Sequence, residues 1–288
     1  MENIIGIDIG GTSIAGGRIS GSTIVKQLTL PTQAALGGNH TLEVLKKVVD
    51  TLINKESGAI GIGVPSVVDR NRGIVYNVQN IKGWEEVHLK ELLEAEFGIP
   101  VYVDNDANCF AYGEKVFGKG KEIENFVGIT LGTGVGGGII QHNQLLRDAN
   151  CGSGEFGEIP YLDSILEDYC GSRFFTRTAH QTAYEVALKA REGDRHAINI
   201  YNEYGKHIAE LVKVILLILD PQAIIFGGSI SQSFDLFQKA MYDNLIHFTY
   251  PKTVEKIQIE ISDLHHMGIL GAAALCVEIT SNRLFPSD

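Results

Sequence analysis

Hydrophobic positions along the first third of the chain change from the alternation of strands to the spacing of a helix. The segment 4–20, IIGIDIGGTSIAGGRIS, predicts a strand, a glycine turn and a second strand. Residues 23–31 continue the strand pattern. At 41–54 the spacing becomes helical, and one face of the expected helix carries Leu42, Leu45, Val48, Val49 and Leu52. This order of elements predicts an α/β protein.

The next segments keep the same alternation. We expect a buried strand at 59–66, a helix at 88–97 that ends at Gly98, a strand at 99–105 that runs into a polar turn, and a helix at 107–118. Farther on, helical patterns cover 172–192 and 195–219, strands are expected at 223–227 and 256–262, and small residues predict a last helix from 268.

The second half repeats the first. Residues 125–141, NFVGITLGTGVGGGIIQ, again predict a strand, a glycine turn and a strand. A constant offset of 122 residues aligns Gly6 with Gly128, Ile7 with Ile129, Gly10 with Gly132 and Gly16 with Gly138. We interpret the match as an internal duplication of one βαβ-type unit. No low-complexity linker separates the halves, so we expect them to pack around a ligand cleft.

The two glycine turns admit three interpretations. GTGVGG at 132–137 has the spacing of a dinucleotide-binding loop, but a strand-like segment follows it where that loop needs a helix. A second interpretation treats both turns as structural hairpins. We favour the third, in which both turns offer backbone N–H groups and a threonine hydroxyl to phosphate oxygens. Asp8 then lies beside the phosphates, where a carboxylate can hold Mg²⁺ directly or through water.

Composition and charge narrow the function further. The chain has 288 residues, of which 44% are hydrophobic, enough for a buried core in one or two domains. The net charge of −11 argues against nucleic acid or an anionic membrane as the main partner. The start, MENIIGIDIGG, has no signal-peptide pattern, the longest apolar run is too short to span a bilayer, and no CxxC pair occurs. We therefore expect a cytoplasmic protein.

Four motifs in this order carry a family resemblance: DIGGT, VDNDAN, LGTGVGGG and IIFGGSIS. Together with GVPSVVD, they resemble the ROK family of sugar kinases, in the sugar kinase, Hsp70 and actin superfamily. The resemblance implies two ribonuclease-H-like (actin-like ATPase) lobes with the active site in the cleft between them. We expect an N-terminal lobe at 1–117, a C-terminal lobe at 118–271, and a C-terminal helix at 272–288 that returns to the first lobe.

The resemblance also implies roles for individual residues. Asp106 matches the catalytic base, and its chemistry agrees, because phosphoryl transfer to a hydroxyl needs a proton acceptor. The alternative for Asp106 is a helix N-cap; Asp104 is the weaker candidate for the base, since its side chain should point to the other face of the strand. Sugar contacts are implied for Ser66, Asn80, Asn105, Asp106, Glu155, Glu158 and Glu167. ATP contacts are implied for Asp8, Gly10, Gly11, Thr12, Thr133, Gly134, Gly227 and Gly228.

The segment 151–172, CGSGEFGEIPYLDSILEDYCGS, departs from the family. Relatives have a histidine at the position of Glu158, followed by a zinc-binding cysteine loop that is missing here. Cys151 and Cys170 cannot complete a tetrahedral site, so we expect no zinc. Glu158 either accepts from a sugar hydroxyl or is a solvated acid. We expect the segment to be anchored by Phe156, Ile159, Tyr161, Leu162 and Ile165, with its three glutamates close together.

The leading functional hypothesis is an ATP- and Mg²⁺-dependent kinase that phosphorylates a free hexose or an N-acetylhexosamine, at O6. The alternative is a catalytically weak or silent sugar-binding protein. Family repressors carry an N-terminal DNA-binding segment, and this chain begins at its first strand, so direct DNA binding is not expected. A homodimer is expected by family analogy. The sequence does not choose among the sugars, because specificity depends on a few hydrogen bonds in the pocket.

Overall fold

The computed structural model describes residues 3–78, 81–147 and 149–284, with side chains up to residue 277. The chain forms two compact units. Unit 1 contains residues 1–121, 147–152 and 264–288, and unit 2 contains residues 122–146 and 153–263.

Unit 1 is built on a five-stranded sheet in the order β3-β2-β1-β4-β8. The first three strands form an antiparallel meander, and β4 and β8 extend it in parallel with β1. The strands are β1 (Asn3–Ile9), β2 (Ser13–Ser20), β3 (Thr23–Pro31), β4 (Ser57–Val64) and β8 (Val101–Asn105). A small sheet holds β5 (Val67–Asp69), β6 (Ile74–Tyr76) and β7 (Glu86–Val87).

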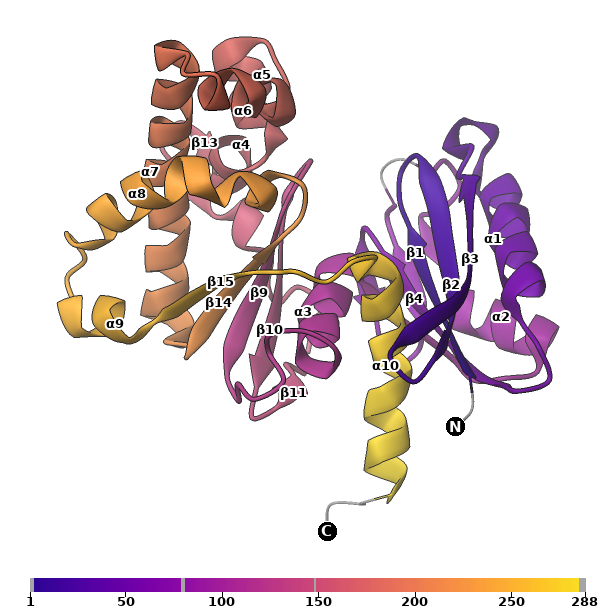
Figure 1. Ribbon diagram of the computed structural model, residues 1–288. Helices are drawn as coiled ribbons and strands as arrows, with labels where there is room; N and C mark the ends of the chain where they lie inside the picture. The colour runs from indigo at the N-terminus through magenta and orange to yellow at the C-terminus, as the bar shows by residue number, and fades with distance from the viewer. Residues whose placement is uncertain (1–2, 79–80, 148, 285–288) are drawn as a thin grey trace. The chain divides into compact units, whose positions relative to one another are not determined.

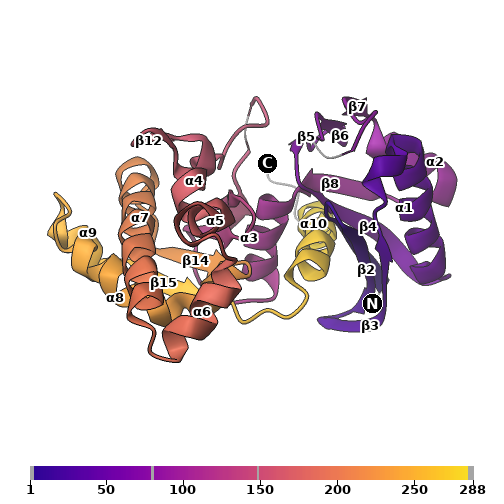
Figure 2. The ribbon, with the colours of Figure 1, turned by 90° about the horizontal axis from the view of Figure 1, so that it is seen from above.

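Helices cover both faces of this sheet (Figures 1 and 2). One face is covered by α1 (Gly38–Leu52), after the turn η1 (Ala34–Leu36), and by α2 (Leu89–Phe97). The other is covered by α3 (Asp106–Val116) and α10 (Met267–Leu284). The expected helical face of α1 is confirmed, because Leu45, Val48, Val49 and Leu52 are buried. Gly98 ends α2 in a left-handed conformation, as expected.

Unit 2 repeats the sheet in the order β11-β10-β9-β14-β15, with the same pattern of antiparallel and parallel pairs. Its strands are β9 (Phe126–Leu131), β10 (Val135–Gln141), β11 (Gln144–Leu145), β14 (Ala223–Gly227) and β15 (Gln258–Ile261), and a hairpin pairs β12 (Pro160–Tyr161) with β13 (Ser164–Ile165). Its helices are η2 (Phe156–Glu158), α4 (Leu166–Cys170), α5 (Ser172–Ala179), α6 (Ala183–Arg191), α7 (Arg195–Leu219), η3 (Ile230–Ser233), α8 (Phe234–Leu245) and α9 (Pro251–Lys256).

The predicted fold class of two similar α/β units is confirmed, and the register refines the duplication. Gly6 pairs with Gly17, and Gly128 pairs with Gly138. Four residues separate the closing pair Ile9–Ile14 of the first hairpin, whereas three separate Leu131 and Val135. The offset is therefore 122 in the first strand of each hairpin but 121 in the second, so the predicted alignment of Gly16 with Gly138 was wrong by one residue.

The single helix expected over 172–192 was also wrong. The chain leaves the helix at His180, which is left-handed with φ 53°. Thr182 then starts α6 with a capping box, in which its hydroxyl accepts the Glu185 N–H and Glu185 bonds the Thr182 N–H in return. The sequence TAYE carried this signal, but the apolar spacing continued across it.

The backbone of α10 packs directly on β1 and β4. A Cβ added at Gly6 or at Gly61 would lie less than 3.0 Å from the carbonyl oxygen of Ile269 or Ala272, respectively. We predict that Gly61→Ala lowers the free energy of unfolding by about 3 kcal/mol, the upper end of overpacking costs, because backbone atoms must move to admit the methyl group. Urea unfolding measures the change.

Gly152→Ala is the matched control, because the nearest atom to its added Cβ, apart from its chain neighbours, would be 3.9 Å away. Equal unfolding midpoints for Gly61→Ala and wild type would contradict the close packing of α10.

Candidate active site

Polar residues gather where three parallel strands of unit 1 end. Asp8 of β1 pairs with Gly63 of β4, and Gly63 pairs with Asp104 of β8. Residues in one row of a sheet point to the same face, so the two carboxylates flank a glycine. A Cβ at Gly63 would lie 3.2 Å from the sulfur of Cys109 in α3. The row therefore brings Asp8 and Asp104 together on the face that α3 covers.

Three carboxylates lie close enough to the thiol of Cys109 to affect its pKa. Its pKa is raised well above the usual value, first by burial and then by the charges of Asp104, Asp106 and Asp8. Burial also raises the pKa of Asp8. The carboxylate of Asp8 lies against the first turn of α10, where a Cβ at Gly268 would come within 3.0 Å of it. The predicted site residues Asp8 and Asp106 thus share one region of unit 1 with Asp104, the weaker candidate for the base.

Asn105, not Asp106, caps helix α3. The Asn105 side-chain oxygen accepts the N–H groups of Ala107 at 2.9 Å and Asn108 at 3.3 Å. Asp106 is the first residue of the helix and is exposed. The alternative that Asp106 serves as the N-cap was therefore wrong. Asn105 also donates through Nδ2 to the carbonyl of Ser66 at 3.2 Å, which joins two of the residues implied to bind sugar.

The hydroxyl of Ser66 is itself engaged. It donates to the carbonyl oxygen of Tyr76 on the neighbouring strand β6. Ser66 is half-buried in the turn that follows β4. Asn80, also implied to bind sugar, lies outside the described residues.

Asp104 has a supporting position. Its side chain is 3% exposed and forms an ion pair with Nε of Arg70 at 3.2 Å. Its other oxygen accepts from Nδ2 of Asn108 at 2.9 Å and from the Asn105 N–H at 2.8 Å. Arg70 carried no signal in the sequence, because its partner is 34 residues away and the pairing of β4 with β8 brings the two together. These contacts hold the end of β8 and the start of α3 in place.

The first glycine turn is held from β3. The hydroxyl of Thr32 donates to the carbonyl of Gly10 at 2.7 Å, and the Thr32 N–H donates to the carbonyl of Thr12 at 3.0 Å. Gly10 donates its own N–H to Ser13 at 2.8 Å. Gly11 and Thr12 are exposed at the tip. The turn is thus rigidly anchored while its tip faces solvent.

The second glycine turn, in unit 2, is held by α4 and α5. A carboxylate oxygen of Glu167 accepts the Val135 N–H at 3.1 Å and packs on Gly134, where a Cβ would come within 3.0 Å of it. The Ser172 N–H donates to Gly132 at 2.9 Å, and its hydroxyl donates to the carbonyl of Thr133 at 3.2 Å. Glu167, implied by resemblance to bind sugar, therefore also supports the turn implied to bind phosphate.

A third glycine pair closes β14 beside this turn. Gly227 pairs with Thr130 of β9. Gly228 has φ 86°, and a Cβ there would lie within 3.0 Å of the Leu131 backbone. The hydroxyl of Ser231 donates to the Gly228 carbonyl at 2.8 Å. Only glycine suits this left-handed, crowded position.

The three glutamates of the segment 151–172 lie near one another. Burial raises the pKa of Glu155, and the charges of Glu158 and Glu167 raise it further. Phe156 is buried, while Ile159 and Tyr161 pack against the core. The anchor predicted at Leu162 was wrong, because its side chain is 71% exposed in a left-handed turn with φ 52°.

Cys170, near the end of the segment 151–172, is packed against α7. The thiol of Cys170 is buried and donates to the carbonyl of His207 at 3.5 Å, and burial raises its pKa. Among the residues that the structure describes, no group of three or more His, Cys, Asp or Glu side chains could hold a metal ion.

Two α/β units with the same sheet order, each with a glycine turn after its first strand, define the class of actin-like sugar kinases and their relatives. The chain belongs to the ROK family, whose model matches residues 4–279. It is 30% identical to a glucokinase from Thermotoga maritima over 96% of this chain and 97% of that protein. It is 27% identical to a xylose repressor from Bacillus spizizenii over 95% of this chain and 77% of the repressor.

The solved structures include a ROK family glucokinase from Streptomyces griseus in complex with glucose and AMPPNP. It is 29% identical to this chain, with a TM-score of 0.82, and the match covers 95% of this chain and 98% of that chain. The predicted family membership is confirmed.

The grouped glutamates give a pH prediction. The folded pKa of Glu155 lies above its usual value of 4.5, so the folded state binds the proton more tightly than the unfolded state. The tighter proton binding stabilises the folded state at pH values below 4.5, and this stabilisation is lost as the pH rises through the raised pKa of Glu155. Glu158→Gln removes one of the repelling charges. We expect it to raise the melting temperature near neutral pH, with the gain shrinking as the pH falls into the acid range.

Calorimetry across this pH range measures the effect, and Glu122→Gln, at an exposed position, is the control. A gain in melting temperature that is the same at every pH would contradict the repulsion.

Proposed function

We propose that this protein is an ATP-dependent sugar kinase that transfers the γ-phosphoryl group to a hydroxyl of a hexose or N-acetylhexosamine, at O6. The observation that carries the proposal is the exposed Asp106, placed at the start of α3 by the Asn105 cap and beside Asp8 and Asp104. Full-length similarity to glucokinases supports it. We further propose that units 1 and 2 are the two domains of the protein, with the C-terminal helix assigned to the first.

In the proposed reaction, Asp106 accepts the proton of the attacking sugar hydroxyl. Its carboxylate is exposed at the helix start, and Asn105 supplies the cap, so proton transfer does not disturb the helix. Further sugar contacts are assigned to Ser66, Asn80, Asn105, Glu155, Glu158 and Glu167. Carboxylates suit this task because sugar hydroxyls are donors. Ser66 already donates its hydroxyl to Tyr76, so toward a sugar it acts as an acceptor.

The phosphates of ATP are assigned to the glycine turns, through Gly10, Gly11, Thr12, Thr133 and Gly134, and the adenosine side to Gly227 and Gly228. Asp8 suits a divalent cation, because Mg²⁺ is usually held by one or two carboxylates together with substrate phosphates. Bound there, Mg²⁺ would neutralise charge that develops on the transferred group. Its presence would also favour the ionised form of Asp8, whose pKa burial raises.

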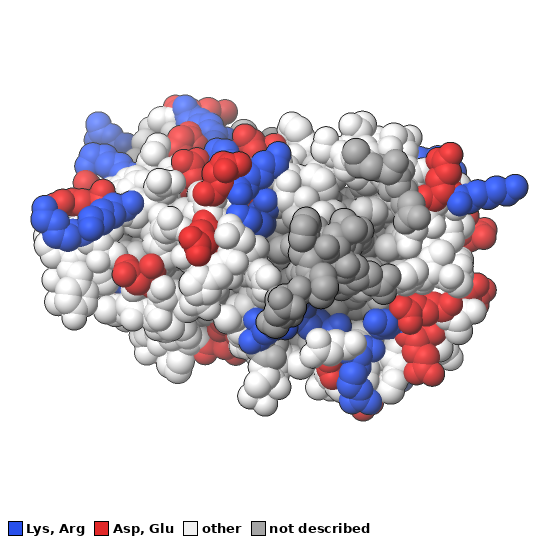
Figure 3. Space-filling model, turned by 90° about the horizontal axis from the view of Figure 1, so that it is seen from below, with Lys and Arg blue, Asp and Glu red and all other residues white. Residues whose placement is uncertain are grey.

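A catalytically silent sugar-binding protein is the second candidate, because the family also contains repressors. On the face drawn in Figure 3, basic and acidic side chains are interspersed over the described residues, and the chain carries a net charge of −11. Neither feature suits the phosphate backbone of DNA. No helix in the described ranges has the length and apolar character to cross a bilayer.

Turnover separates the two candidates. We expect ADP release when the protein is mixed with ATP, Mg²⁺ and a panel of glucose, mannose, fructose, N-acetylglucosamine and N-acetylmannosamine, with at least one sugar raising the rate above the ATP-only background. Sugar binding by calorimetry without ADP release from any of them would favour the silent protein.

Asp106→Asn tests the assigned base. Because asparagine cannot accept the proton, we expect kcat to fall by at least about 10²-fold while sugar affinity stays close to that of the wild type. Stopped assays of product give kcat, and calorimetry gives the affinity.

Asp50→Asn, an exposed substitution on α1, is the matched control and should leave both values unchanged. If Asp106→Asn retains more than half of the wild-type turnover, Asp106 is not the base.

A further inference from the structure

Helix α4 carries Glu167 but is too short to hold its own position. It has five residues, Leu166–Cys170, and Ile165 at its start makes no side-chain capping bond. Helices of this length are unstable in isolation, because nucleation costs more than so few hydrogen bonds return. The place of Glu167 must therefore come from tertiary contacts.

On one side, α4 contacts the second glycine turn. Glu167 accepts the Val135 N–H at 3.1 Å, and the Ser172 N–H, just beyond α4, donates to Gly132 at 2.9 Å. We call Glu155, Glu158 and Glu167 the glutamate cluster. A displacement of α4 would therefore have two effects together: it would move one carboxylate of this cluster, and it would break a contact to the second glycine turn. Glu167 and the second glycine turn are therefore held by the same helix and would be displaced together.

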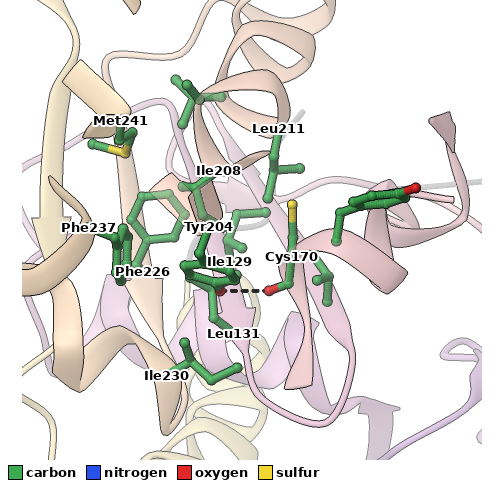
Figure 4. Packing of buried hydrophobic residues seen from close by; sticks show 14 of the residues in the cluster. Ile129, Leu131, Cys170, Tyr204, Ile208, Leu211, Phe226, Ile230, Phe237 and Met241 are labelled. Atoms are coloured by element: carbon green, nitrogen blue, oxygen red, sulfur yellow. Dashed lines mark hydrogen bonds between the residues drawn. The ribbon is translucent and has the colours of Figure 1, made fainter. Parts of the chain in front are cut away.

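On the other side, α4 is held by the long helix α7. The hydroxyl of Tyr204 donates to the carbonyl of Cys170, the last residue of α4, at 2.7 Å (Figure 4). The Cys170 thiol donates to the carbonyl of His207, one turn farther along α7, at 3.5 Å. Tyr204 is fully buried and His207 is 7% exposed. Both hydrogen bonds are therefore shielded from water, and they fix the end of α4 on α7.

His207 also holds the hairpin that leads into α4. Its Nδ1 lies 3.0 Å from the hydroxyl of Tyr161, and its ring lies 4.9 Å from that of Tyr169. Burial lowers the pKa of His207 and raises that of Tyr161 to about 12, so both are neutral near neutral pH. Nε2 faces a carboxylate oxygen of Glu203 at 3.9 Å, which favours the proton on Nε2. Nδ1 then accepts from Tyr161.

We propose that Tyr204 and His207 are positioning residues: from α7 they hold both ends of the segment 159–170, so that Glu167 keeps the Val135 N–H and the glutamate cluster and the Thr133–Gly134 turn stay in register. This inference rests on the proposed function in assigning the cluster to sugar and the turn to phosphate. The mechanical link itself does not depend on that assignment.

Tyr204→Phe and Tyr201→Phe form a matched pair for the test. Tyr201 is also fully buried on α7, and its hydroxyl donates to the carbonyl of Ala183 at 2.8 Å, outside the segment 159–170. Each variant loses a hydrogen bond of similar length from the hydroxyl of a buried tyrosine. We expect amide exchange of Val135 to accelerate by about tenfold in Tyr204→Phe, the size expected when one buried hydrogen bond is lost, and to stay at the wild-type rate in Tyr201→Phe.

Kinetics give the second readout. With a sugar that turns over, Tyr204→Phe should raise KM for sugar and for ATP together by several-fold with little change in kcat, and Tyr201→Phe should change neither. His207→Leu should remove the protection of the Val135 amide from exchange. His207→Asn should retain this protection, because the asparagine oxygen can accept a hydrogen bond near the position of Nδ1. Tyr161→Phe gives the same test if Tyr204→Phe fails to fold.

Val135 exchange that is equal in Tyr204→Phe and Tyr201→Phe overturns the proposal, whether or not any sugar is phosphorylated. Exchange that differs as expected in a protein without kinase activity keeps the mechanical link and rejects the proposed function instead.

Discussion

The contact between the backbone of α10 and strands β1 and β4 is the constraint on which the geometry of unit 1 depends. Any side chain at Gly6 or Gly61 would occupy the space of α10 carbonyl groups. The same helix packs on α3 at Gly271, where a Cβ would lie 2.5 Å from the carbonyl of Cys109. Because protein interiors are densely packed and these glycines have no side chain, the sheet and the two helices can pack with their backbones in contact. That places the first turn of α10 against Asp8 and the start of α3 beside Gly63.

Unit 2 uses glycine in a similar way but for a different purpose. Gly154 lies on the backbone of Gly137, and Gly228 lies on that of Leu131, each with less than 3.0 Å available for a Cβ. In unit 1 the close approach brings a helix onto the sheet. In unit 2 it brings loops onto β9 and β10, so that the segment bearing Glu155 and the turn after β14 both lie next to the second glycine turn. The duplicated sheets therefore carry different polar groups at equivalent edges.

The supports of the two glycine turns differ accordingly. The first turn is tied to Thr32, which directly follows β3 of the same sheet, and needs no element outside that sheet. The second is one residue shorter and is tied to Glu167 and Ser172, whose positions depend on α7. A loss of order in α4 would therefore reach the second turn, whereas the first turn has no such dependence. This asymmetry connects the aromatic core around Tyr204 with the polar groups of unit 2.

Local patterns in the sequence were sufficient for the α/β class, the repeated strand–turn–strand unit, the C-cap at Gly98 and the glycine turn that follows the first strand of each unit. These features follow from the spacing of apolar residues and from backbone freedom at glycine, which act over a few residues. The tertiary structure settled the rest. The N-cap at Asn105 and the exposed Leu162 are local, but they follow from where β8 ends and from a left-handed turn, which apolar spacing does not define. The Arg70–Asp104 pair and the second role of Glu167 join residues more than 30 positions apart, and a one-dimensional pattern carries no information about such a partner.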